Sequence, residues 1–373
     1  MQCPSIPEID LAEWGEGLKS RLGEKRYPYT ATFEITDRCN LSCVHCYINQ
    51  AASSNAARSN ELSTEQVSTI LDQIAEAGCL FLTFTGGDPL LRPDFPDIYR
   101  HAKRLGMVVS IFTNGTLITP EIADMLVEYT PRVVEITLYG ATQQNYERVT
   151  RTPGSFKRAH RGIQLLLDRQ VPLSLKTMVM TINQHEFDDM KAYAEGLGVK
   201  FRYDGLLWPR LNGDPTPSQY QLPLEALLKL EFRAAEAQKE WLRLSKRFEG
   251  QPTRQERVFS CGIARRSFHI DSRGMLSGCM SLRRPAYDLK KITFLEGWER
   301  LGSLPLLKRQ LDTPFRSCTL NDLCNQCPGW SQAVHGDDET PVTFLCQLAH
   351  LRAKKIIEFR MYCNLNEEVS SYA

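Results

Sequence analysis

The sequence contains no run of about 18 apolar residues, the length that a helix needs to cross a membrane. Its first residues, Met1-Gln2-Cys3-Pro4, lack the basic and then apolar segments of a secretory signal. Neither sign of charge dominates, because 45 Lys and Arg face 44 Asp and Glu, so no global field favours nucleic acid or an anionic membrane. These absences predict a cytoplasmic protein with no membrane span and no nucleic-acid partner.

Cysteine, in contrast, is plentiful, with 12 copies among 373 residues. In a reducing compartment, clustered cysteines bind metal or do chemistry more often than they form disulfides. Nine of them gather in two regions, namely Cys39, Cys43 and Cys46 near the start and Cys261, Cys279, Cys318, Cys324, Cys327 and Cys346 in the last third. Cys3, Cys79 and Cys363 stand apart and are predicted to be unliganded, with Cys79 in the core.

Apolar segments of strand length alternate with amphipathic segments over the first two hundred residues. The strands are predicted at 30–36, 80–85, 107–112, 133–138, 173–180 and 200–207, and the helices at about 63–77, 94–105, from 120 onward, 156–169 and 185–196. Strands alternating with helices imply a parallel sheet. Six such units favour an open barrel, in which the active site lies at the C-terminal ends of the strands.

The predicted fold is therefore α/β, a partial (β/α)6 TIM-type barrel followed by a smaller, cysteine-rich C-terminal α+β domain. The predicted boundaries are an N-terminal extension (1–29), the barrel (30–208), a linker and helix (209–250), the cysteine-rich domain with a C-terminal helix (251–361) and a tail (362–373). The linker is rich in Pro, Gly and Asn, and helices are expected at about 224–248 and 345–360.

The triplet Cys39-x3-Cys43-x2-Cys46 directly follows the first predicted strand. Iron–sulfur cubanes usually take four thiolates, so three leave one iron open to a small molecule. This spacing resembles the motif of the radical S-adenosylmethionine (radical SAM) enzymes. The resemblance implies a [4Fe–4S] cluster that binds SAM and cleaves it reductively to a 5′-deoxyadenosyl radical. The alternative is a zinc site, which usually needs a fourth ligand that His45 is poorly placed to supply.

Other segments at strand ends resemble the SAM contacts of the same family. Gly86-Gly87-Asp88-Pro89 is similar to the family's Gly-Gly-Glu-Pro segment, whose backbone receives the methionine ammonium, and here Asp replaces Glu. Glycine at these positions allows a ligand to approach the backbone closely. Tyr47 follows the triplet and is expected either to pack on the adenine or to lie in the core.

Thr113 and Asn114 follow the third strand and resemble the family's segment beside the SAM ribose, although Asn-Gly is also a common turn. Glu135 lies inside the apolar fourth strand, where a charge needs a reason. It is expected to contact the ribose or to pair with Lys176 of the fifth strand.

Many relatives carry an arginine before a Pro-Gly-Ser-Phe segment, where it pairs with the SAM carboxylate. Here Thr150 stands at that position. The neighbouring Arg148 or Arg151 is expected to substitute, unless both are simply solvated.

The C-terminal cysteines resemble those of a SPASM domain, which binds auxiliary [4Fe–4S] clusters in many peptide-modifying radical SAM enzymes. Phe315 replaces one expected cysteine, and the Cys324-x2-Cys327 spacing is one residue short. The resemblance implies one or two auxiliary clusters, held by Cys261, Cys279 and Cys327 and by Cys318, Cys324 and Cys346. The Cys324-x2-Cys327 pair alone would also suit structural zinc.

The resemblance implies hydrogen-atom abstraction from a ribosomally made precursor peptide, leading to crosslinking, epimerisation or backbone excision and splicing. Many such enzymes carry an N-terminal winged-helix module that captures the leader peptide. About 30 residues precede the barrel here, which is too few for that module. A separate leader-peptide recognition protein is therefore expected as a partner. A flavodoxin or ferredoxin is expected as electron donor. Two alternatives stay open, namely a radical SAM enzyme acting on a small molecule in cofactor biosynthesis, and a non-enzymatic Fe–S electron carrier or zinc-binding interaction protein.

Overall fold

The computed structural model describes residues 25–48, 50–245 and 256–370, together with Gly17, Ser20, Arg21 and Gly23. Cys3 and most of the predicted N-terminal extension lie outside the described residues. Among the described helices, none is long and apolar enough to cross a membrane.

Six parallel strands form the body of the fold, in the order β1-β4-β5-β6-β7-β8. They are β1 (Thr30–Glu34), β4 (Phe81–Thr85), β5 (Val108–Thr113), β6 (Val133–Thr137), β7 (Leu173–Met178) and β8 (Lys200–Asp204). Each of the six coincides with a predicted strand to within a few residues, and the α/β class with its parallel sheet is confirmed.

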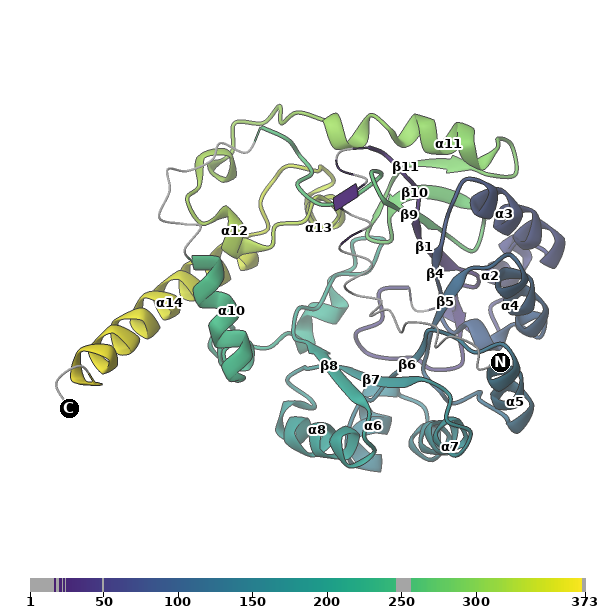
Figure 1. Cartoon of the computed structure of the whole chain (residues 1–373), viewed down its shortest axis with the longest axis horizontal. Helices are drawn as coiled ribbons and strands as arrows, with labels where there is room; N and C mark the ends of the chain where they lie inside the picture. Colours follow the sequence, from purple (N-terminus) through teal and green to yellow (C-terminus); the bar gives the residue numbers. More distant parts are fainter. Residues whose placement is uncertain are drawn as a thin grey trace, which may run out of the picture.

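Helices between these strands cover the outer face of the sheet (Figure 1). They are α3 (Thr64–Glu76), α4 (Phe95–Arg104), α5 (Pro120–Glu128), α6 (Gln143–Thr150), α7 (Ser155–Asp168) and α8 (Phe187–Gly196). The predicted capping box forms at α3, because Ser63 Oγ accepts from Gln66 N and Gln66 Oε1 accepts from Ser63 N. Helix α6 was not predicted, since its polar sequence has no apolar periodicity.

The two faces of the barrel strands differ in chemistry. Side chains such as Phe33, Leu82, Phe84 and Ile111 are fully buried against the helices in one apolar core. Alternate positions on the same strands carry polar or charged groups that point to the other face. Because side chains alternate along a strand, the barrel interior is polar and suited to a site.

The sheet does not end at β1. Strand β9 (Ser267–Ile270) pairs in parallel with β1, and β10 (Met275–Cys279) and β11 (Leu282–Asp288) extend it as antiparallel strands covered by α11 (Phe294–Leu301). The predicted C-terminal domain therefore shares one nine-stranded sheet with the barrel. The exact domain boundaries stay a prediction.

Five further helices lie in the described chain after β8. They are α9 (Leu224–Glu231), α10 (Ala235–Ser245), α12 (Asn321–Cys324), α13 (Pro328–His335) and α14 (Thr343–Ser370). The single helix predicted at 224–248 is thus two helices, and the final helix begins earlier and ends later than the predicted 345–360. Buried Arg352 of α14 bonds Glu231 of α9 at 2.7 Å and so ties these helices together.

Short elements complete the described chain. They are α2 (Asn55–Asn60), the two-residue strands β2 (Arg38–Cys39) and β3 (Gln50–Ala51), and the 3-10 helices Pro89–Leu91, Gln184–Glu186, Thr216–Tyr220, Leu304–Leu306 and Pro314–Ser317. Strand β2 carries the first cysteine of the triplet and directly follows the C-terminal end of β1.

Candidate active site

The cysteine triplet lies on the loop that leaves the C-terminal end of β1. Two backbone bonds fasten this loop to the end of α6, because Ser42 N donates to Thr150 O at 3.0 Å and Val44 N to Val149 O at 3.0 Å. A third closes a turn inside the loop, from Cys46 N to Cys43 O at 3.1 Å. The loop is therefore held in place by the barrel itself.

The three thiols of the triplet lie close enough to influence one another. Burial raises the pKa of Cys39 to about 12, with further contributions from the charges of Asp88 and Cys46. Burial also raises the pKa of Cys43 well above its usual value, helped by the charges of Cys46 and Cys39. Thiolates are unfavourable here without a cation, and iron would supply the compensating charge. The donor set therefore fits an iron–sulfur cluster.

The Gly86-Gly87 turn presses directly against the start of the cysteine loop. A Cβ on Gly86 would lie 2.1 Å from Thr36 O, and one on Gly87 would lie 2.1 Å from Arg38 O. Gly87 N donates to Thr36 O at 2.8 Å. Only glycine fits here, and φ of +140° at Gly86 adds a second reason.

Asp88 joins the turn after β4 to the end of β5. Its carboxylate accepts from Thr113 Oγ1 at 2.8 Å, from Asn114 N at 2.8 Å and from Leu90 N at 3.0 Å. The carboxylate is fully buried, and burial raises the pKa of Asp88 to about 6 despite these bonds. Asp88 thus links the end of β4 to the end of β5. The following residue, Pro89, is buried.

Asn114 links the end of β5 to the cysteine loop. Its Nδ2 donates to Asn40 Oδ1 at 2.9 Å and lies 3.6 Å from Cys39 Sγ. Asn40 in turn donates to Thr116 Oγ1 at 2.8 Å. The predicted SAM-contacting segments after β1, β4 and β5 therefore meet at one edge of the barrel.

The two predicted arginines lie at the C-terminal end of α6. Arg148 is exposed on α6, and Arg151 is exposed and donates to Tyr220 Oη at 3.3 Å. In the part of the chain that the structure describes, neither forms a hydrogen bond or ion pair with the cysteine loop. Thr150, at the family's arginine position, is buried, with its hydroxyl 2.8 Å from Ser155 Oγ.

Glu135 faces the barrel interior and is surrounded by cations. Lys176 Nζ lies 2.8 Å from Oε1, and Arg202 Nη1 lies 3.1 Å from Oε2. Lys176 also lies over the ring of Phe112, with Nζ 3.6 Å from the ring centroid. The alternative that Glu135 pairs with Lys176 is thus confirmed, and burial lowers the pKa of Lys176.

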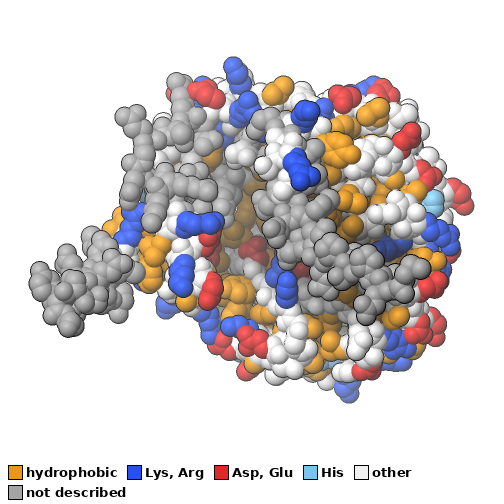
Figure 2. All heavy atoms as spheres, in the orientation of Figure 1, with side chains coloured by type: hydrophobic (Ala, Val, Ile, Leu, Met, Phe, Trp, Pro, Cys, Tyr) orange, Lys and Arg blue, Asp and Glu red, His pale blue; other side chains and the backbone are white. Residues whose placement is uncertain are grey.

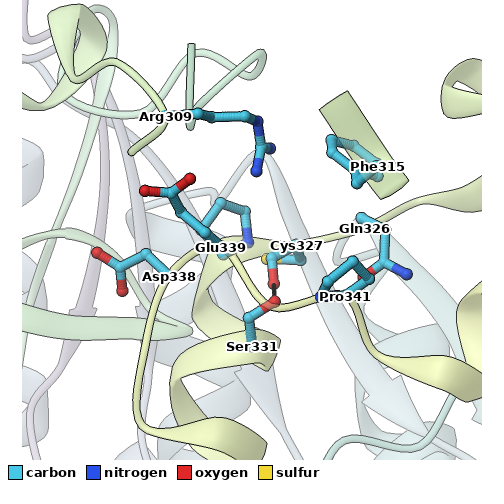
Figure 3. Close-up of a pocket in the computed structure, with 9 residues that line it drawn as sticks. Arg309, Phe315, Gln326, Cys327, Ser331, Asp338, Glu339 and Pro341 are labelled. Atoms are coloured by element: carbon cyan, nitrogen blue, oxygen red, sulfur yellow. Dashed lines mark hydrogen bonds between the residues drawn. The ribbon is translucent and has the colours of Figure 1, made fainter. Parts of the chain in front are cut away.

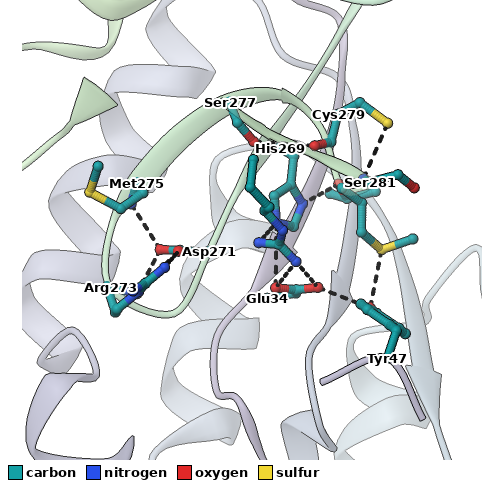
Figure 4. Close-up of polar contacts among 12 residues, drawn as sticks. Glu34, Tyr47, His269, Asp271, Arg273, Met275, Ser277, Cys279 and Ser281 are labelled. Atoms are coloured by element: carbon teal, nitrogen blue, oxygen red, sulfur yellow. Dashed lines mark hydrogen bonds and ion pairs between the residues drawn. The ribbon is translucent and has the colours of Figure 1, made fainter. Parts of the chain in front are cut away.

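A second interior network, centred on Glu34, was missed at the sequence level. Arg283 donates to both carboxylate oxygens at 2.9 and 2.8 Å, and Tyr47 Oη donates to one of them at 2.9 Å (Figure 4). His269 lies 3.4 Å from Glu34 and 2.8 Å from Thr32 Oγ1. Burial opposes ionisation of Glu34, but His269 and Arg283 outweigh it and lower its pKa to about 2.

A signal for Glu34 was present in the sequence. It is a charged residue inside the apolar segment 30–36, which is the same argument that singled out Glu135. Its partners His269 and Arg283 are far away along the chain and carried no signal. Tyr47, expected near the adenine or in the core, places its hydroxyl in this network and 3.3 Å from Met280 Sδ.

The C-terminal cysteines influence one another's pKa within the two predicted sets. Burial raises the pKa of Cys327 to about 11; helix amides at Trp330 and Gly329 lower it, while the charges of Cys279 and Cys261 raise it. The three thiols of this set are therefore neighbours, although Cys261 is exposed.

The other set behaves in the same way. Burial raises the pKa of Cys324 to about 11; the amide of Gln326 lowers it, and the charges of Cys346 and Cys318 raise it. Gln326 Nε2 also lies 3.3 Å from Cys346 Sγ. Among the described residues, no three His, Cys, Asp or Glu side chains are arranged to hold a single metal ion.

Several of these sulfurs accept a backbone N–H from the residue two positions later. The distances are 3.4 Å from Leu41 to Cys39, 3.5 Å from Ser281 to Cys279 and 3.4 Å from Leu320 to Cys318. Gln326 and Gly329 stand in the same relation to Cys324 and Cys327. Such bonds favour the thiolate and tune cluster potentials. Both cysteine regions therefore share this backbone N–H to sulfur contact.

Arg309 lies beside both C-terminal sets. It lines a small cavity together with Cys327, Gln326 and Glu339, as Figure 3 shows. Its guanidinium lies 4.4 Å from the ring centroid of Phe315, and its buried Nε has no hydrogen-bond partner among the described residues. Burial lowers the pKa of Arg309, while the charges of Glu339 and Cys324 raise it.

Part of the chain matches a known protein family. Residues 33–194 match the sequence model of the Radical SAM superfamily. These residues hold all three strand-end segments described above, including the triplet after β1. The comparison therefore shows a radical SAM domain over these residues.

Individual relatives point in two directions. An AdoMet-dependent heme synthase of Methanosarcina barkeri is 27% identical, with the match covering 83% of this chain and 94% of the relative. The mycofactocin maturase MftC of Mycobacterium ulcerans is 32% identical over 52% of this chain, which spans about half (53%) of the maturase. Streptococcus suis SuiB bound to precursor peptide SuiA shares the fold, with a TM-score of 0.65 and 14% identity over 92% of this chain and 84% of SuiB.

Proposed function

We propose that this enzyme binds SAM and a [4Fe–4S] cluster through Cys39, Cys43 and Cys46 and abstracts a hydrogen atom from a precursor peptide. The observation that carries the proposal is the convergence of the triplet with the Gly86-Gly87 turn and Asn114 at one edge of the barrel. When bound, the cluster and SAM supply the 5′-deoxyadenosyl radical that starts the reaction.

The protein's own residues position and enclose these groups. The glycine turn leaves its backbone free of side chains beside the cysteine loop, as SAM recognition by backbone atoms requires. Asp88 and Asn114 keep the strand ends and the loop in a fixed relation. The ion pairs of Glu34 and Glu135 make the interior polar and neutralise these two buried carboxylates.

Auxiliary [4Fe–4S] clusters are part of the same proposal. The grouping of Cys261 with Cys279 and Cys327, and of Cys318 with Cys324 and Cys346, supports two sites of three thiolates each. Clusters at these positions would accept an electron from the substrate or bind it directly.

A peptide substrate is favoured because two of the similar proteins are a maturase and an enzyme bound to a precursor peptide. Crosslinking, epimerisation and backbone excision or splicing are the outcomes that this class suggests. A separate leader-binding protein and a flavodoxin or ferredoxin as electron donor stay predictions.

A second candidate is a radical SAM enzyme that acts on a tetrapyrrole. The observation in its favour is that the match to the heme synthase covers most of both chains. The non-enzymatic alternative finds no support in these matches.

The test is anaerobic reconstitution with iron and sulfide, followed by a dithionite-plus-SAM assay for 5′-deoxyadenosine. We expect about eight to twelve irons per chain, from four irons per cluster. Mass spectrometry of candidate peptides and of iron coproporphyrin III, each incubated with the reduced enzyme, then identifies the substrate. Iron without SAM cleavage would contradict the proposal.

A further inference from the structure

A cavity of about 440 Å³ lies on the interior face of the added strands β9 to β11, where the chain returns to the barrel. This volume lies within the range of small-molecule sites. Its lining residues are Asp271, Arg273, Met275, Ser277, Arg283, Arg284, Ala286 and Lys290. The face of the molecule in Figure 2 is hollowed near its centre, between the barrel and the segment that holds α10 and α14.

Positive charge dominates the lining of this cavity. Asp271 neutralises Arg273, with Nη2 2.6 Å from Oδ2. Arg283 is neutralised from behind by Glu34. Within the described residues, Arg284 and Lys290 are exposed and have no ion-pair partner, so both cations are available to an anion. An anion is therefore the ligand that this wall favours.

Part of the wall is preorganised, whereas Arg284 and Lys290 are exposed. Arg283 is fixed by its two bonds to Glu34 and by Nη1, which lies 2.9 Å from His269 Nε2. Asp271 accepts from the backbone of both Arg273 and Met275, at 2.9 and 3.0 Å (Figure 4). A rigid wall loses little entropy when it binds a ligand.

The cavity adjoins the cysteine loop. Asp37, two residues before Cys39, accepts a hydrogen bond from Ser272, which lies between two lining residues. Through Glu34, Arg283 also connects to Tyr47, directly after Cys46. A ligand in this cavity would thus lie beside the loop that holds the reactive cofactors.

We propose that this cavity binds a carboxylate of the substrate through Arg284 and Lys290. The inference rests on the proposed function, because both candidate substrates carry carboxylates: acidic side chains or the C-terminus in a peptide, and propionates in a porphyrin. The planar guanidinium of arginine pairs well with a carboxylate. A carboxylate held in this way would orient the rest of the substrate toward the cysteine loop.

The test measures binding to the reconstituted enzyme and to the double variant Arg284→Gln/Lys290→Gln. One arm titrates iron coproporphyrin III and its tetramethyl ester by absorbance. The other arm titrates a short peptide that carries acidic side chains and a free C-terminus, and a version of it with amides in place of all carboxylates, by calorimetry. The matched control is Lys291→Gln, because Lys291 is 80% exposed, pairs with Asp288 and does not line the cavity.

We expect the double variant to bind one carboxylate probe at least about tenfold more weakly, with the uncharged counterpart unaffected and the control like wild type. The affected arm identifies the source of the carboxylate. Unaltered iron content and melting temperature show that the variant is folded.

Equal binding by wild type and double variant would overturn the inference, as would failure of both carboxylate probes to bind wild type at millimolar concentration. The proposed function is judged separately, by 5′-deoxyadenosine formation in wild type. An enzyme that binds a probe through these cations without cleaving SAM would refute that function and leave the cavity assignment intact.

Discussion

The two cysteine regions reach similar geometry by different routes. The N-terminal triplet comes from eight consecutive residues, 39–46, and is fastened to α6 by backbone hydrogen bonds. The C-terminal sets draw on separate segments from Cys261 to Cys346, and their members range from exposed to buried. The first site is thus largely local, whereas the second exists only when strands and helices far apart in sequence have packed.

This difference predicts how each cysteine region loads iron. The local site needs only the barrel strand ends around it, so it is expected to load iron independently of the C-terminal region. The C-terminal sets depend on tertiary structure, including the Arg352–Glu231 pair and the shared sheet. The comparison therefore predicts an asymmetric response to mutation.

The largest effect is expected from removing either cysteine region. Changing Cys39, Cys43 and Cys46 to Ala should abolish 5′-deoxyadenosine formation and remove about four irons per chain. Changing Cys261, Cys279 and Cys327 to Ala should also remove about four irons but leave SAM cleavage measurable, because the barrel residues form the SAM site. Iron counting and the 5′-deoxyadenosine assay check both, and loss of SAM cleavage in the second variant would break the proposed independence.

The next largest effect concerns the link between the regions. Glu34 of the barrel holds Arg283 of the added strands, and Glu34→Gln would leave a largely buried guanidinium without its counter-charge. We expect a loss of about 3–5 kcal/mol in the free energy of unfolding, measured by denaturant titration. Glu195→Gln is the control, because Glu195 is 63% exposed and its pair with Lys191 contributes little.

The same carboxylate gives a pH signature. The pKa of Glu34 is lowered from 4.5 to about 2 in the folded protein. Its contribution to stability is therefore present above pH 4.5 and is lost as the pH falls from 4.5 toward 2. The stability difference between wild type and Glu34→Gln should shrink over that range, and a difference independent of pH would contradict the ion-pair explanation.

A smaller but specific effect is expected at the glycine turn. Gly87→Ala places a Cβ about 2 Å from Arg38 O, so the start of the cysteine loop must shift. We expect 5′-deoxyadenosine formation to fall by about tenfold or more, since small misplacements of reacting groups are costly. Gly196→Ala, where the added Cβ meets no atom within 4 Å, should behave like wild type.

The contrast between the regions also explains what the sequence could predict. The six barrel strands, the capping box and the triplet follow from local patterns, so they were predicted within a few residues. Helix α6 escaped because its sequence is polar, and the merging of β9 with β1 escaped because a pairing between residue 30 and residue 267 leaves no local signal. Likewise, the Glu135–Lys176 pair could be predicted because the two residues lie on neighbouring barrel strands. The Glu34–Arg283 pair could not, because Arg283 lies far from Glu34 along the chain.

The smallest predicted effect concerns reduction potentials. It tests whether a charge near the C-terminal clusters changes their potentials without changing that of the SAM-binding cluster. Arg309 is 7% exposed and lies beside Cys327 and within the field of Cys324. A nearby cation stabilises the reduced, more negative form of a cluster, so Arg309→Gln should lower the midpoint potentials of the auxiliary clusters and Arg309→Lys should change them less. Redox titration followed by electron paramagnetic resonance measures this. The SAM-binding cluster should keep its potential in both variants. A change in the potential of that cluster alone would contradict the placement of Arg309 beside the C-terminal cysteines.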